Sequence, residues 1–142
     1  MTQIDFYFHV ESRLHTACSL SAKAYARGLR VLAFCPDAAT GQKFSRLLWT
    51  AQAVSFIPHC AASDTLAALT PVIVDHDGSN PAHDEVLINL RAEWPPFFSR
   101  FQRLIEIVSL DEEERSQARE RFRFYRDRGY AIRSHDLSKS AQ

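Results

Sequence analysis

The sequence predicts an α/β fold in which a mostly parallel central sheet lies between two layers of helices. Three observations support this prediction. Strand-like and helix-like segments alternate along the chain without an internal repeat or a linker. One strand-like segment, LRVLAFC at 29–35, is apolar at every position after Arg30, which is typical of a parallel strand covered on both faces. The length of 142 residues, 46% of them hydrophobic, suits one domain, expected over 1–135 with a flexible tail at 136–142.

The first segments predict a strand, a helix and a second strand. Residues 4–10, IDFYFHV, are aromatic and β-branched, which favours a strand. Residues 11–27 carry apolar side chains at roughly helical spacing, and Gly28 supplies the stop. The apolar strand at 29–35 then ends at Pro36. A right-handed crossover is expected to join the two parallel strands.

A second helix is expected over 38–51, with Asp37 as its N-terminal cap. Its apolar residues recur at helical spacing and form one face, and Trp49 lies outside that face. The next apolar segment, 54–60, contains Pro58, so it is expected to be an edge strand or a loop rather than a central strand.

The second half of the chain predicts short strands at 71–74 and 86–90, separated by a polar loop. Pro95 and Pro96 suit a first helical turn, so a helix is expected over 96–101. Residues 103–108, RLIEIV, predict a further strand.

The last helix is expected within the segment 110–129. Acidic residues crowd its first turn at 111–114 and Gly129 follows its end, which suits the helix dipole and a glycine cap. After it, 130–132 is expected to add an edge strand, and the polar residues 134–142 are expected to fray.

Composition excludes several classes of protein. The 17 basic and 17 acidic residues cancel, which argues against a surface devoted to nucleic acid. Three widely separated cysteines without CxxC spacing suggest neither a disulfide framework nor a zinc site. No apolar signal region follows Met1 and no apolar run approaches membrane-spanning length, so a cytoplasmic protein is expected.

The glycines argue against a nucleotide site. The four glycines, at positions 28, 41, 78 and 129, form neither GxGxxG nor GxxxxGK[ST]. The turns after Val10 and Cys35 have no glycine that would let backbone amides approach a phosphate. We therefore expect a Rossmann-like fold without its nucleotide, and no cofactor.

An acidic loop offers an alternative function. Asp75, Asp77 and Asp84 are ligand types that magnesium prefers, so a metal-dependent phosphoryl-transfer enzyme or nuclease stays open. Gly78 and Pro81 instead favour an ordinary solvated turn, and no metal ligand or catalytic residue is assigned.

The last helix is expected to carry the main binding surface. Six arginines follow its acidic first turn, against only Glu120 and Asp127: Arg115, Arg119, Arg121, Arg123, Arg126 and Arg128. Four of them form one stripe, namely Arg115, Arg119, Arg123 and Arg126. Beside it runs an apolar stripe of Ala118, Phe122 and Tyr125, with Phe122 where the two meet.

Guanidinium groups beside an apolar seam suit a peptide that ends in a carboxylate and an aromatic side chain. Two alternatives remain. One is a solvated charged face with local pairs such as Asp111 to Arg115. The other is direct binding of single-stranded nucleic acid, which would need aromatic stacking platforms. The aromatic residues Trp49, Phe56 and Trp94 are either core residues or anchors for a partner.

Several segments together resemble the chi subunit family of bacterial DNA polymerase III, a clamp-loader accessory protein. They are DFYF at 5–8, RVLAFC at 30–35, LLWT at 47–50, SFIPH at 55–59, DEVLINLR at 84–91 and ARERFRFYRDRGY at 118–130. The order and spacing of these segments carry the resemblance, which spans nearly the whole chain. It implies a non-catalytic DNA replication adaptor that forms a heterodimer with the psi subunit. It also implies binding to the acidic C-terminal tail of the single-stranded-DNA-binding protein, and contact with nucleic acid only indirectly.

The resemblance also implies which residues do the binding. The tail-binding positions match Val108, Arg115, Arg119, Phe122 and Arg123. At the positions of Arg115 and Arg123 the family often has lysine, and at the position of Phe122 the family often has tyrosine. Charge is therefore retained, whereas a phenolic hydrogen bond is lost. The surface that faces psi matches Trp49 and Phe56.

Overall fold

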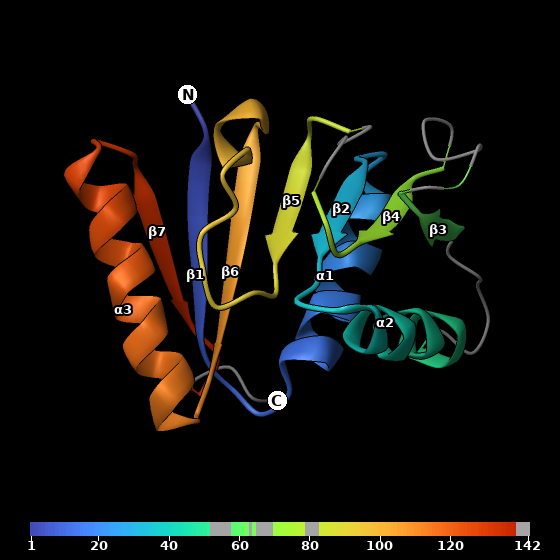
Figure 1. Ribbon diagram of the computed structural model, residues 1–142, viewed down its shortest axis with the longest axis horizontal. Helices are drawn as coiled ribbons and strands as arrows, with labels where there is room; N and C mark the ends of the chain where they lie inside the picture. The colour runs from blue at the N-terminus through green and yellow to red at the C-terminus, as the bar shows by residue number, and fades with distance from the viewer. Residues whose placement is uncertain (52–57, 63, 65–69, 79–82, 139–142) are drawn as a thin grey trace.

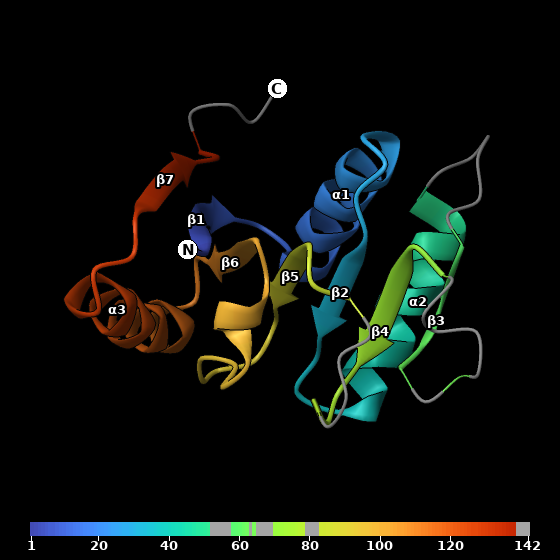
Figure 2. The same cartoon turned by 90° about the horizontal axis from the view of Figure 1, so that it is seen from above.

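A seven-stranded parallel sheet organises the chain. The computed structural model describes residues 1–51, 58–62, 64, 70–78 and 83–138. The strand order is β3-β4-β2-β5-β6-β1-β7, and every pairing is parallel. The helices α1 and α2 cover one face and α3 covers the other, as Figures 1 and 2 show. The predicted three-layer α/β fold is confirmed.

The elements alternate along the chain much as the sequence predicts. In order they are β1 (Gln3–Val10), α1 (Arg13–Ala26), β2 (Val31–Phe34), α2 (Ala38–Ala51), β3 (His59–Ala61), β4 (Val72–Asp75), β5 (Val86–Asn89), a 3-10 turn η2 (Phe98–Arg100), β6 (Arg103–Ser109), α3 (Glu112–Asp127) and β7 (Ile132–Asp136). In the described part of the chain, no helix combines the length and the apolar character needed to cross a membrane.

Two hydrophobic cores flank the sheet, one on each face, and strand β2 contributes side chains to both. Val31 and Ala33 belong to the core under α1 and α2, whereas Leu32 and Phe34 belong to the core on the α3 side. Successive side chains of a strand point to opposite faces, so a strand between two helical layers is buried on both faces and is mostly apolar. Burial of every residue in β2, β4 and β5 follows from this.

Aspartate caps fix the starts of two helices. Asp37 Oδ1 accepts a hydrogen bond from the Thr40 amide at 2.7 Å, which confirms the predicted cap of α2 and lowers the Asp37 pKa. At α3, Asp111 accepts from the Glu114 amide at 3.0 Å. The start of α3 is thereby set just after the carboxyl end of β6.

Two predicted elements are wrong in extent. The helix expected at 96–101 is only the single turn η2, because Phe101 is already extended and leads into β6. The edge strand expected at 130–132 runs instead from Ile132 to Asp136, and pairs with β1 from Ile4 to Phe8. The chain therefore does not fray at 134–136, because the open edge of β1 supplies backbone partners for its polar residues.

The region around Pro58 is described only in part. β3 lies at one edge of the sheet and pairs with β4 alone, which agrees with the predicted edge position. Residues 54–57 of the predicted segment, and 139–142 of the predicted tail, lie outside the described residues.

Candidate functional site

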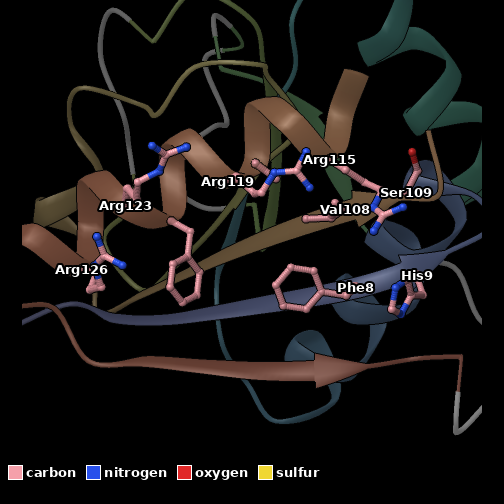
Figure 3. A pocket seen from close by; sticks show the side chains of 10 residues that line it. Phe8, His9, Val108, Ser109, Arg115, Arg119, Arg123 and Arg126 are labelled. Atoms are coloured by element: carbon pink, nitrogen blue, oxygen red, sulfur yellow. The ribbon is translucent and has the colours of Figure 1, made fainter. Parts of the chain in front are cut away.

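A cavity of about 330 Å³ lies between α3 and the carboxyl ends of β1 and β6. Its lining comprises Phe8, His9, Val108, Ser109, Arg115, Ala118, Arg119, Phe122, Arg123 and Arg126. Figure 3 shows arginines along α3 on one side, with Val108 and the β1 residues Phe8 and His9 opposite. All five residues predicted to bind a peptide tail therefore line this one cavity.

The floor of the cavity is apolar and continuous with the core. The Phe6 ring is stacked with Phe8, with centroids 5.7 Å apart, and lies 5.3 Å from the centroid of Phe122. Val108 and Ala118 are buried at the same place. Because Phe6 is fully buried, it holds both cavity phenylalanines in position and preforms a surface for an apolar ring.

The rim of the cavity is basic, and its internal ion pairs are weak ones. Glu112 lies 3.6 Å from Arg115 and 3.2 Å from Arg119, whereas Glu120 lies 3.1 Å from Arg123. These arginine side chains are between 43% and 56% exposed. Pairs of this kind contribute about 0–1 kcal/mol each, so an incoming carboxylate can replace them.

The local pair expected between Asp111 and Arg115 does not form. Asp111 is the helix cap, and Arg115 pairs with Glu112 instead. The solvated charged face predicted as an alternative is therefore present, but it surrounds a hollow with an apolar floor.

Arg121 does not belong to the basic surface, contrary to the prediction. It is only 3% exposed; its Nε donates to Glu106 at 3.0 Å and its Nη1 to the Ala92 carbonyl at 2.6 Å. Arg128 also lies apart, over the Phe124 ring at 3.7 Å. Sequence reasoning missed the partner of Arg121, although an isolated Glu106 within the apolar RLIEIV strand was the available signal.

Glu106 is the centre of a buried polar network that fixes α3 to the sheet. Besides Arg121, it accepts hydrogen bonds from the Tyr125 hydroxyl at 2.6 Å and from Asn89 Nδ2 at 3.0 Å. Burial and the Glu106 charge raise the Tyr125 pKa far above its ordinary value. Since two residues of α3 bind one carboxylate on β6, the rotation of the helix is set, and with it the direction of the arginine stripe.

The predicted partner surface is described only around Trp49. This side chain is 64% exposed on α2, and its ring meets His59 edge-on with centroids 6.4 Å apart. Hollows of about 510 and 500 Å³ lie on its two sides, one toward β3 and β4 and the other toward α1. Phe56 lies outside the described residues. Trp94, by contrast, stacks on Phe124 at 3.7 Å and has an intramolecular role.

The structure keeps Asp84 apart from Asp75 and Asp77, the other two residues of the alternative enzyme site, which share one turn. Asp75 is 5% exposed, and its carboxylate accepts the amides of His76 at 2.8 Å and Gly78 at 2.9 Å, as in an ordinary turn. Asp75 ends β4, whereas Asp84 precedes β5. In a parallel sheet these two residues therefore lie at opposite ends of the strands, about 16 Å apart along the strand direction. No group of three potential metal ligands occurs within the described ranges.

Comparison with known proteins agrees with the resemblance in the sequence. Residues 1–133 match the family profile described as DNA polymerase III chi subunit, HolC. The chain is 36% identical to DNA polymerase III subunit chi of Pseudomonas aeruginosa, over 98% of this chain and 99% of that protein. It is 30% identical to the subunit chi of Haemophilus influenzae over 85% of each chain. For Escherichia coli, identity is 28% over 81% of this chain and 79% of that one. The chain therefore belongs to the DNA polymerase III chi subunit family of DNA replication accessory subunits.

Proposed function

We propose that this chain is a cytoplasmic adaptor that binds the acidic C-terminal tail of the single-stranded-DNA-binding protein and pairs with the psi subunit. One observation carries the first half of the proposal. The five residues that the family resemblance implies for tail binding line a single cavity, which combines an apolar floor with guanidinium groups at its rim.

The chemistry of the cavity suits a peptide with a terminal aromatic residue. The terminal ring would lie on Phe8, Val108 and Phe122, where apolar surface is available without disturbing the core. The terminal carboxylate and the preceding acidic residues would then meet the arginines, whose planar forks bind carboxylates by paired hydrogen bonds. Phe122 offers the ring no hydroxyl, so recognition depends on stacking and charge.

Binding of one tail is expected to be modest and sensitive to salt. The arginines are about half exposed, so their attraction for an acidic peptide is screened by ions. Tethering to the clamp loader through psi would let several tails on coated DNA act together and raise the effective affinity.

Calorimetry with a synthetic acidic tail peptide tests the site. We expect Arg119→Ala to weaken binding by about 1.5–3 kcal/mol, the scale of a charge-assisted hydrogen bond. Arg128→Ala is the matched control, because this arginine caps the C-terminus of the same helix but lies over Phe124. Amidation of the peptide C-terminus should weaken binding in the same way. Undiminished binding by Arg119→Ala would refute the assignment.

The psi surface is proposed from Trp49, which is exposed beside two hollows, and from Phe56 by the resemblance. Exposed aromatic anchors of this kind commonly dominate an interface. We expect Trp49→Ala and Phe56→Ala to lose co-purification with psi while the isolated variants stay folded by circular dichroism. Arg119→Ala should keep psi, which separates the two surfaces. Normal co-purification of both aromatic variants would place the interface elsewhere.

A further inference from the structure

His9 has an unusual backbone at the edge of the cavity. Its φ is +60°, and it is the single non-glycine residue with positive φ among those described. The β1–β6 register shifts between Tyr7 and Val10. Neighbouring side chains in a strand normally point to opposite faces, yet Phe8 and His9 both line the cavity. The irregular backbone is therefore what turns His9 toward the arginines, as seen in Figure 3.

Asp136 holds the His9 ring in this position. His9 Nδ1 lies 2.8 Å from Asp136 Oδ1, at the end of β7. The register aligns Asp136 with Phe8, and the Leu137 amide donates to the Phe8 carbonyl at 3.0 Å. Hydrogen bonds from the Ser138 hydroxyl and from His9 lower the Asp136 pKa to about 2. Asp136 is therefore a carboxylate at neutral pH, and His9 Nδ1 must carry the hydrogen.

The second ring nitrogen of His9, Nε2, has no hydrogen-bond partner among the described residues, and the side chain is 38% exposed. With Nδ1 donating to Asp136, a neutral ring can only accept at Nε2, whereas a protonated ring donates there. A carboxylate ligand requires the donor.

Charges on several elements act on His9. From β7, Asp136 favours the protonated ring. From α3, Arg115, Arg119, Arg123 and Arg126 line the same cavity and oppose protonation. Glu114, whose carboxylate accepts from the cavity residue Ser109 at 2.5 Å, favours it. An anionic ligand would shift this balance toward the imidazolium, so ligand binding and proton binding must be linked.

We propose that His9 is a further binding residue of this cavity, which donates from Nε2 to a carboxylate of the acidic peptide while Asp136 orients and charges the ring. The inference rests on the proposed binding of an acidic tail. His9 would add one pH-dependent contact to the contacts made by the permanently charged arginines. The peptide is thereby bound more tightly as His9 gains its proton, and the complex takes up a fraction of a proton when it forms.

The test is calorimetry of the intact chain with the same tail peptide at several pH values, in two buffers of different ionisation enthalpy. For the native chain we expect Kd to fall about fivefold to tenfold between about pH 8 and about pH 6, with net proton uptake on binding. His9→Asn should abolish both effects. Asparagine tolerates positive φ and retains a donor toward Asp136, so the fold is preserved. His15→Asn, at an exposed histidine of α1, should behave like the native chain.

The variant Asp136→Asn shows whether Asp136 orients His9 or only repels the acidic peptide. If Asp136 positions and charges His9, this variant binds the peptide several-fold more weakly and loses the pH dependence. If Asp136 only repels an acidic ligand, the variant binds more tightly, and the proposal is overturned. A native Kd that changes less than about twofold over this pH range, or an unchanged pH profile in His9→Asn, also overturns it. If the native chain does not bind the peptide at any pH, the proposed function itself is refuted.

Discussion

The buried carboxylate of Glu106 makes a quantitative prediction about stability. Tyr125 is fully buried, and its hydroxyl donates to Glu106 Oε2 at 2.6 Å. Tyr125→Phe removes this hydroxyl and keeps the ring, which packs against Phe6 and Phe98. The perturbation is thus confined to one hydrogen bond to a buried charge.

The expected loss of stability depends on the hydrogen bonds that Glu106 keeps in the variant. A hydrogen bond to a charged group contributes about 1.5–3 kcal/mol, and the variant leaves Glu106 with Arg121 and Asn89. We therefore expect Tyr125→Phe to lower the free energy of unfolding by about 2 kcal/mol. In a domain of this size, a loss of this magnitude corresponds to a decrease in Tm of about 4–8 °C.

Urea unfolding followed by circular dichroism at pH 7 measures this difference, and Tyr130→Phe is the control. Tyr130 also packs on Phe98, with centroids 5.1 Å apart, but its hydroxyl has no hydrogen-bond partner among the described residues. We expect the control to change stability by less than about 0.5 kcal/mol. Because the folded pKa of Tyr125 is raised, the native advantage over Tyr125→Phe should persist below about pH 10 and diminish above it. Equal stability of Tyr125→Phe and Tyr130→Phe would refute this account of the network.

Three further results are expected. Burial alone would raise the pKa of Asp5, but hydrogen bonds from His135 and Arg103 lower it, so the stability from Asp5 should be present at pH 7 and lost below about pH 4. Urea unfolding of Asp5→Asn should then show lower stability at pH 7 and a shallower decline in acid. Burial raises the thiol pKa of Cys18 and Cys35 to about 12, so both should resist alkylation at pH 8 until the chain is unfolded, as mass spectrometry would show. In a filter assay without partner proteins the chain should retain little single-stranded oligonucleotide; strong retention would instead favour direct nucleic-acid binding.

The position of the arginine stripe was predictable because helical periodicity is a local property. Arg115, Arg119 and Arg123 recur every four residues, and a helix must place them on one side whatever surrounds it. Phe122 follows from the same geometry. The expected tail-binding residues therefore came together in one cavity, with Val108 supplied by the neighbouring strand.

The burial of Arg121 was decided by Glu106, a residue on strand β6. Local spacing cannot distinguish it from its exposed neighbours, and only the packing of α3 on β6 brings it to Glu106. The position of His9 in the cavity could not be predicted from local sequence either. It depends on a shifted register and on Asp136, which lies 127 residues away along the chain.

The sequence by itself determined the alternation of strands and helices, the parallel sheet and the charge of the last helix, because each depends on periodicity, turn residues and composition over short windows. Only the tertiary structure decided the strand order, the length of β7 and the depth of the cavity. These depend on which side chains meet after the chain has folded. Arginine spacing specified a basic stripe, whereas the packing of Phe8, Val108 and Phe122 beneath it formed a site.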